Sequence, residues 1–287
     1  MKNLILLLII ALVSFNGQAK ELEAYVIYTA EGKKVDIDKV MRAADGKRYI
    51  FFGELHNNPI SHWLQFELTT RLYGMYKNRV MLGAEMFEAD NQYIIDEYLQ
   101  NKISGKNFQN EVRLWPNYNT DYKPLMEFAK DKGLRFIATN IPRRYASMAY
   151  KQGIDSLKTL SDEAKKYIVP LETFEFDSTV ECYSKMIFEF GDHGGVNIAI
   201  AQALKDATMA HFILQNVENR NVFIHYNGAY HSDNKQGIIH YLKKEVDEDK
   251  IMTLTTVLQQ DTDKLLEENQ GKADFIICVP ETMTTTH

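Results

Sequence analysis

Side chains able to move protons or bind ions follow four apolar runs of this sequence. They are Glu54 with His56, Glu85, Arg143 with Arg144, and His231. Runs rich in β-branched and aromatic residues that end in Gly, Asn or Pro are typical of buried strands and their exit loops. The carboxyl ends of parallel strands meet at one edge of a sheet, so we expect these residues to converge there. The alternative is that each residue only caps the helix after its strand.

Two carboxylates and two histidines at one sheet edge indicate two kinds of chemistry. Glu54, His56, Glu85 and His231 could together bind a divalent ion such as Zn²⁺ or Mn²⁺, or iron. The same four side chains could instead act as catalytic acids and bases that activate water. Both readings predict a site in which the carboxylates are paired, because an unpaired buried charge is costly.

Four further residues are candidates for ligand binding. Arg143 or Arg144 could hold an anionic group at the rim of the site, since guanidinium binds carboxylate and phosphate bidentately. Gln202 and Asp206 are four residues apart, so they share one face of a predicted helix rich in small residues. That face either points into the site or is exposed to solvent, and we favour the site.

For three other histidines we expect structural or solvent-exposed positions and no role in the site. His225 is in the middle of a predicted strand and is interpreted as a hydrogen-bonded core residue. His62 is expected to be exposed on its helix, and His193 to be solvated in a glycine-rich turn.

Hydrophobic periodicity predicts strands and helices in alternation. The predicted strands are 24–29, 34–37, 49–52, 79–87, 134–140, 221–228, 251–258 and 275–279. The predicted helices are 38–44, 59–76, 90–99, 121–131, 197–216 and 237–243. This order indicates an α/β fold with a mainly parallel sheet flanked by helices, together with a small helical lobe inserted at about 145–195. We expect 102–120 to be irregular and Asp121 to cap the next helix.

The first residues resemble an export signal. A basic start precedes a 12-residue apolar run, 4–15, and Gly17-Gln18-Ala19 has small residues where a signal peptidase cleaves. Twelve residues are too few to span a bilayer, so no transmembrane segment is expected. We therefore predict a signal peptide of 1–19, one domain of 20–287, and a periplasmic or extracellular location.

Net charge and cysteine content exclude some classes of function and of metal site. The net charge of −6 argues against nonspecific nucleic-acid binding. Cys182 and Cys278 are the only cysteines, which excludes a zinc site made of thiolates. Their separation in sequence leaves open whether they pair.

Five motifs in order resemble the ChaN-like family of iron-regulated haem-binding proteins, over about Tyr49 to Leu242. They are Gly53-Glu54-Leu55-His56-Asn57-Asn58-Pro59, Gly83-Ala84-Glu85-Met86-Phe87, Asn140-Ile141-Pro142-Arg143-Arg144, Ala201-Gln202 with Asp206-Ala207-Thr208-Met209-Ala210, and Asn227-Gly228 with His231. The resemblance implies a parallel sheet with a small helical lobe, export, and a role in haem or iron uptake. It also implies a homodimer that holds haem between its subunits through a tyrosine ligand. The family is similar to Tiki proteases and erythromycin-esterase-like enzymes, which implies a metal-dependent hydrolase as the alternative function.

The sequence departs from the family pattern at the last motif, where Ala229-Tyr230 separate Gly228 from His231. The haem-ligating tyrosine lies outside the shared motifs, so the resemblance does not assign it. Tyr118, Tyr145, Tyr183 and Tyr230 are the candidates.

Overall fold

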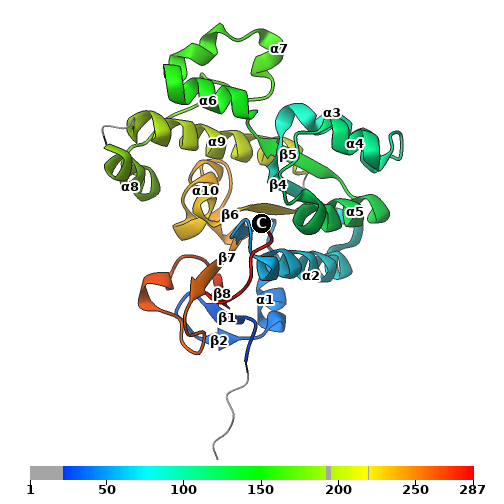
Figure 1. Ribbon diagram of the computed structural model, residues 1–287, viewed down its shortest axis with the longest axis vertical. Helices are drawn as coiled ribbons and strands as arrows, with labels where there is room; N and C mark the ends of the chain where they lie inside the picture. The colour runs from blue at the N-terminus through cyan, green and yellow to red at the C-terminus, as the bar shows by residue number, and fades with distance from the viewer. Residues whose placement is uncertain (1–21, 192–194, 219) are drawn as a thin grey trace, which may run out of the picture.

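The computed structural model describes residues 22–191, 195–218 and 220–287. Its eight-stranded sheet has the order β2-β1-β8-β7-β3-β6-β4-β5 (Figure 1). The strands are β1 (Val26–Thr29), β2 (Lys34–Val35), β3 (Tyr49–Glu54), β4 (Val80–Glu88), β5 (Phe136–Asn140), β6 (Val222–Gly228), β7 (Ile251–Gln259) and β8 (Phe275–Pro280). Every neighbouring pair from β8 to β5 is parallel, whereas β1 pairs antiparallel with β2 and β8. The predicted α/β fold with a mainly parallel sheet is confirmed.

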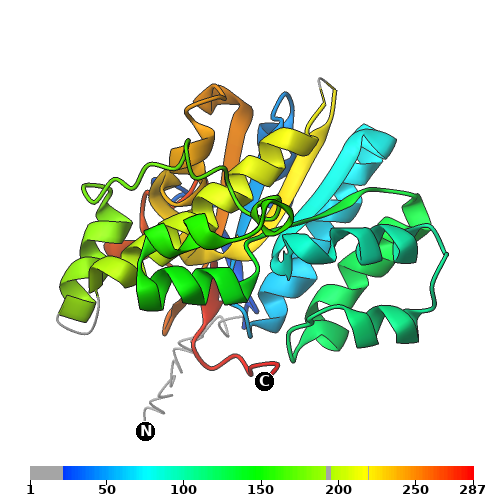
Figure 2. The same ribbon diagram turned by 90° about the horizontal axis from the view of Figure 1, so that it is seen from above.

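Helices cover both faces of this sheet. They are α1 (Ile37–Ala44), α2 (Pro59–Tyr76), α3 (Gln92–Leu99), α4 (Gly105–Glu111), α5 (Lys123–Lys132), α6 (Arg143–Gln152), α7 (Asp162–Lys165), α8 (Glu181–Phe190), α9 (Gly195–Asn216) and α10 (Ile238–Leu242). In Figure 1, α2 to α5 lie on one side of the sheet and α6 to α10 on the other. Figure 2 shows α9 running across the strands, and this helix packs on β5, α6, α8 and α10.

The central strands are apolar along their whole length because both of their faces are covered. In β3, Ile50 and Phe52 belong to the core beneath α2, while Tyr49 and Phe51 belong to the core beneath α9. Successive side chains of a strand point to opposite faces, so an uninterrupted apolar run supplies both cores. These two cores hold the ends of β3, β4 and β6 in fixed positions.

The stretch expected to be irregular contains a helix and a π-turn. Helix α4 begins after Ser104, whose hydroxyl accepts a hydrogen bond from the backbone N–H of Asn107 at 3.1 Å. A π-helical turn, Tyr118–Tyr122, follows, and Asp121 lies inside it. The prediction that Asp121 caps the next helix is therefore wrong, because α5 begins one residue later, after Tyr122.

The described residues from 143 to 190 contain helices and connecting loops only, with a 3₁₀ segment η4 (Ile154–Thr159) between α6 and α7. The predicted lobe boundaries of 145–195 remain a prediction, and His193 lies outside the described residues. The predicted signal peptide also lies outside them. Cys182 and Cys278 are both unpaired thiols. No helix in the described part of the chain is long and apolar enough to cross a membrane.

Candidate functional site

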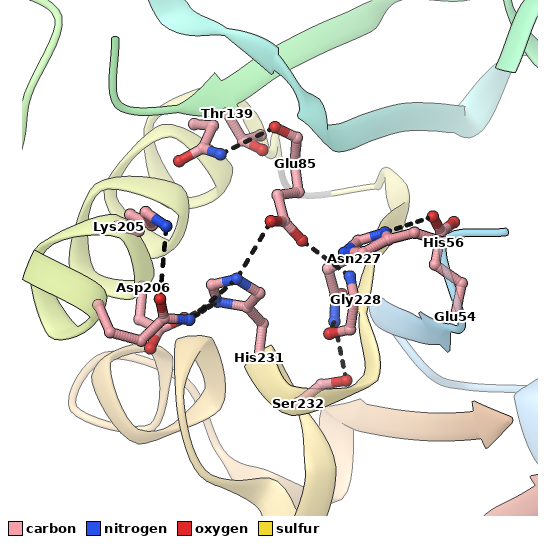
Figure 3. A network of polar contacts seen from close by, with 12 residues as sticks. Glu54, His56, Glu85, Thr139, Lys205, Asp206, Asn227, Gly228, His231 and Ser232 are labelled. Atoms are coloured by element: carbon pink, nitrogen blue, oxygen red, sulfur yellow. Dashed lines mark hydrogen bonds and ion pairs between the residues drawn. The ribbon is translucent and has the colours of Figure 1, made fainter. Parts of the chain in front are cut away.

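Three adjacent parallel strands end side by side and carry the predicted site residues. Strand β6 lies between β3 and β4, and Glu54 is paired in register with Gly228. Glu54 ends β3, Glu85 lies near the end of β4, and His231 follows β6 in a short 3₁₀ turn, η6 (Ala229–His231). Figure 3 shows Glu85 and His231 directed toward one another, and Glu54 directed toward His56, at this edge.

Glu54 and His56 form the first pair. The Nδ1 atom of His56 lies 2.9 Å from Oε1 of Glu54, a carboxylate that is only 1% exposed. The hydroxyl of Tyr122 donates to the same oxygen at 2.7 Å, and the amide of Gln65 donates to the other oxygen. The imidazole of His56 is 39% exposed, so it is the solvent-facing member of the pair. Burial lowers the pKa of His56, but Glu54 and Glu85 outweigh burial, and the pKa lies above its usual value.

His231 lies between two carboxylates and forms the second part of the site. Its Nε2 is 3.1 Å from Oε1 of Glu85, and its Nδ1 is hydrogen-bonded to Asp206 on α9. All three side chains are buried. Burial alone would lower the pKa of His231, but the two carboxylates raise it to about 10. His231 is therefore an imidazolium at neutral pH.

The two carboxylates beside His231 have opposite pKa shifts. Burial works to raise the pKa of Glu85, yet the charge of His231, together with hydrogen bonds from His231 and from the Gly228 backbone N–H at 2.8 Å, holds it well below its usual range. Burial dominates at Asp206 and raises its pKa. Of the two carboxylates, Glu85 therefore holds its negative charge more strongly, and Asp206 takes up a proton more readily. Gln202, on the same face of α9, lies 3.1 Å from Nε2 of His231.

Gly228 is where the two halves of the site meet. A Cβ atom at this position would lie 2.7 Å from Nε2 of His56 and 3.5 Å from Oε2 of Glu85. Only a residue without a side chain lets His56 approach the end of β6 this closely. The structure therefore brings Glu54, His56, Glu85 and His231 into one site, with Gln202 and Asp206 beside it.

Comparison with known proteins identifies the family. Residues 40–242 match the family described as haem-binding uptake, Tiki superfamily, ChaN. The chain belongs to this ChaN family.

Two solved structures share the ChaN-like fold. The structure "Cofacial heme binding to ChaN of Campylobacter jejuni" superposes with a TM-score of 0.64 at 16% identity, covering 88% of this chain and 96% of that one. A Bacillus cereus protein superposes with a TM-score of 0.52 at 10% identity, covering 85% of this chain and 91% of that one.

A curated relative shares part of the sequence. Protein RETICULATA-RELATED 5, chloroplastic, of Arabidopsis thaliana, is 25% identical over 186 residues, 59% of this chain. This chain thus spans about a quarter, 25%, of the length of that relative.

The two arginines of this ChaN-family chain do not join the Glu and His side chains. Arg144 pairs through Nη1 with Asp90 at 2.6 Å and donates to the hydroxyl of Tyr145. Arg143 is exposed in the first turn of α6. Among the described residues, no hydrogen bond or ion pair connects either arginine to the four Glu and His side chains. The place of Arg143 or Arg144 at the rim of the site stays a prediction; Lys205 is a cation close to the site, with its Nζ 3.4 Å from Oε1 of Gln202.

The sequence interpretation missed a polar group behind Glu54. His62, expected to be exposed, is 6% exposed, and its Nε2 lies 3.1 Å from the backbone oxygen of His56. Asn117 donates to that same oxygen at 2.8 Å and to Asp121 at 2.6 Å. His62 lies on the first turn of α2, directly after the loop that carries His56. This closeness in sequence was the signal that could have placed His62 near the site. Nothing in the local pattern indicated that the π-turn would fold back onto β3.

The polar side chains of the site form pairs and do not surround a common central point. Each of the buried carboxylates Glu54 and Glu85 is already satisfied by protein donors. Within the part of the chain that the structure describes, no three His, Cys, Asp or Glu residues are arranged to hold a metal ion. The expectation of a divalent metal held by Glu54, His56, Glu85 and His231 is unsupported. His225 is buried between Thr139 and Asn227, and burial lowers its pKa to about 4, as expected for a core residue.

Proposed function

We propose that this protein binds haem and acts, after export, in haem or iron acquisition. Membership of the ChaN haem-binding uptake family is the observation that supports the proposal. Export through the segment 1–19 and a homodimer that shares haem belong to the same proposal. Mass spectrometry of protein from the cell envelope tests export, because cleavage after Ala19 removes residues 1–19.

The four candidate tyrosines differ in how well they fit a haem iron. Tyr118 and Tyr183 are buried, and the hydroxyl of Tyr183 donates to Asp206 at 2.8 Å. Tyr145 lies beneath the guanidinium of Arg144, which is 4.3 Å from the ring centre. Tyr230 is 42% exposed, which makes it the accessible phenol beside the site.

Tyr230 is hydrogen-bonded to helix α8, which carries exposed aromatic side chains. The hydroxyl of Tyr230 donates to the backbone oxygen of Cys182 in the first turn of α8. Helix α8 also carries Phe188 and Phe190, which are 89% and 44% exposed, and Val196 on α9 is 52% exposed. Exposed aromatic side chains fit the apolar face of a porphyrin. Bound haem would supply a ferric iron, a Lewis acid that the phenol oxygen of Tyr230 would hold. Tyr230 would have to release Cys182 to hold the iron in this way.

Replacing Tyr230 with phenylalanine is expected to weaken haem binding by at least about tenfold, because the phenol oxygen that would hold the iron is lost. Titration of hemin into the protein, followed at the Soret band, measures the affinity. Tyr93→Phe is the matched control, since Tyr93 is 68% exposed on α3 and lies outside the proposed surface. A wild-type protein without a saturable Soret shift would overturn haem binding. Equal affinities for wild type and Tyr230→Phe would overturn only the choice of ligand.

A second candidate function is hydrolysis by acid–base catalysis, and the arrangement of His56 favours it. A carboxylate can only accept hydrogen bonds, so Nδ1 of His56 carries the proton donated to Glu54. Nε2 is then the basic nitrogen, and it lies beside Gly228 and Glu85. A base held in this way at the solvent boundary can take a proton from water as the water attacks a substrate carbonyl.

His56→Gln is expected to lower the hydrolysis of short-chain p-nitrophenyl esters by about 100-fold or more, because the general base is lost. His211→Gln on α9 is the control, since His211 lies on the same helix as Asp206 but outside the site. The initial rate should follow the titration of His56, rising with pH as the imidazole loses its proton. A rate that is the same in His56→Gln as in wild type would exclude catalysis by this histidine.

A further inference from the structure

The loop after β3, which carries His56, is held through its backbone as well as through the imidazole. The Nδ2 atom of Asn117 donates to the backbone oxygen of His56 at 2.8 Å, and Nε2 of His62 lies 3.1 Å from the same oxygen. Asn117 and His62 are both buried. A backbone fixed at this point limits where the imidazole of His56 can lie.

Asp121 connects the groups behind this loop. Its side chain is 3% exposed, and its Oδ2 accepts a hydrogen bond from Asn117 at 2.6 Å. The same oxygen lies 3.4 Å from Nε2 of His62 and accepts a hydrogen bond from the hydroxyl of Thr286 at 2.7 Å. A carboxylate is an acceptor for several hydrogen bonds at once, so Asp121 can hold donors from three separate parts of the chain together.

Thr286 contacts the two segments that hold the Glu54–His56 pair. Its backbone N–H donates to the backbone oxygen of Asn57 at 2.9 Å, and Asn57 directly follows His56. Its hydroxyl donates to Asp121, which lies in the π-turn that also donates to Glu54. Thr286 therefore joins the loop of the base to the turn that holds the carboxylate partner of the base.

The path of the C-terminal segment brings Thr286 to this place. Strand β8 is parallel to β7, and β7 is parallel to β3, so β8 ends at the same edge of the sheet as β3. After β8, the backbone N–H of Glu281 donates to the backbone oxygen of Gln259 at 3.0 Å, and Met283 packs against the core beneath α2. In Figure 1 this segment leaves β8 and ends near α2. Thr285 is exposed, whereas Thr286 is partly buried.

We propose that Thr286 is a positioning residue for His56: it fixes the loop after β3 against the π-turn and so keeps the imidazole on Glu54 with the proton on Nδ1. The inference deepens the second candidate function and rests on it, because His56 is the base there. Without this contact the loop is held less firmly, and the hydrogen bond from Nδ1 to Glu54 breaks more often. The hydrogen bond of one ring nitrogen sets which nitrogen carries the proton, so its loss lets the proton move to Nε2. A protonated Nε2 cannot act as the base.

Nitrogen-15 NMR of the neutral imidazole of His56 measures the ratio of the Nδ1–H form to the Nε2–H form in the whole protein. Thr286→Val keeps the shape of the side chain but removes the hydroxyl, and we expect this ratio to fall about tenfold, the effect of one lost hydrogen bond to a carboxylate. Deletion of 286–287 also removes the contact with Asn57 and should lower the ratio further. Thr286→Ser, which keeps the hydroxyl, should retain the wild-type ratio. Thr285→Val is the matched control, since it removes an exposed hydroxyl from the preceding residue.

The outcomes separate this proposal from the second candidate function. An unchanged ratio in Thr286→Val and in the deletion variant would overturn the positioning role. An equal fall in Thr285→Val would overturn it too, because any change in the segment would then have the same effect. In the hydrolysis of p-nitrophenyl esters, kcat should fall in Thr286→Val while KM stays the same, since the base is displaced and the substrate surface is not. A wild-type protein without esterase activity would refute hydrolysis, whereas the ratio of the two imidazole forms would still decide whether Thr286 positions His56.

Discussion

We expect Glu85→Gln to lower the pKa of His231 and to reduce the free energy of unfolding by about 3 kcal/mol. The imidazolium of His231 is buried between Glu85 and Asp206, so removing one carboxylate leaves a buried charge only partly compensated. Breaking a buried pair by removing one partner costs about 3–5 kcal/mol, and the remaining Asp206 places this case at the lower end. Urea unfolding at pH 7 gives the free energy, and a histidine NMR titration gives the pKa.

Glu88→Gln provides the matched control on the same strand. Glu88 pairs with Arg113, whose side chain is 47% exposed. In Glu88→Gln, water therefore solvates the guanidinium that has lost this carboxylate partner. We expect a change in the free energy of unfolding of no more than about 1 kcal/mol and no change in the pKa of His231. Equal losses of stability in the two variants would contradict the ion pair as the cause.

Alkaline pH is expected to destabilise the protein through His231. Its pKa is raised from 6.5 to about 10 in the folded protein, so the folded state binds the proton more tightly than the unfolded chain. The resulting stability is fully present below pH 6.5 and is lost progressively as the pH rises through 10. A pKa difference of this size corresponds to a contribution on the order of 4–5 kcal/mol. Urea midpoints measured between pH 6 and pH 10.5 test this.

The Glu85→Gln variant separates this effect from the titration of lysines and tyrosines. With one carboxylate fewer, the pKa of His231 in the folded variant is lower. The protonation of His231 should therefore contribute less to the free energy of unfolding of the variant, and this contribution should disappear at a lower pH. Lysines and tyrosines elsewhere titrate alike in both proteins. Parallel stability curves for the two proteins between pH 6 and pH 10.5 would show that His231 is not the source.

The strand exits were predictable because the local pattern carries the information. The run Tyr49–Phe52 is apolar without interruption, which indicates a strand buried on both faces, and its end places Glu54 at the sheet edge. The same argument located Glu85 and His231. Parallel pairing then brings the three ends together, and the observed neighbours β3, β6 and β4 confirm it.

Residues whose position depends on how a loop or a helix turns could not be placed in this way. Arg144 follows its strand directly, yet Asp90 from another element binds its guanidinium. His62 was expected on the exposed face of α2, but the end of the π-turn covers that face, with the ring of Tyr122 5.1 Å from the ring of His62. Both outcomes are decided by groups distant in sequence.

The sequence by itself determined the α/β fold, the parallel strands and the edge where Glu54, His56, Glu85 and His231 meet, because apolar periodicity and strand ends are local properties. Only the tertiary structure decided how these groups pair: Glu54 with His56, and His231 between Glu85 and Asp206. Their pKa values depend on burial and on charges a few ångströms away, and residues far apart in the chain supply both. The physical reason is that hydrophobic patterning reports which face of an element is buried, whereas hydrogen bonds and ion pairs require distances that only the packed chain defines.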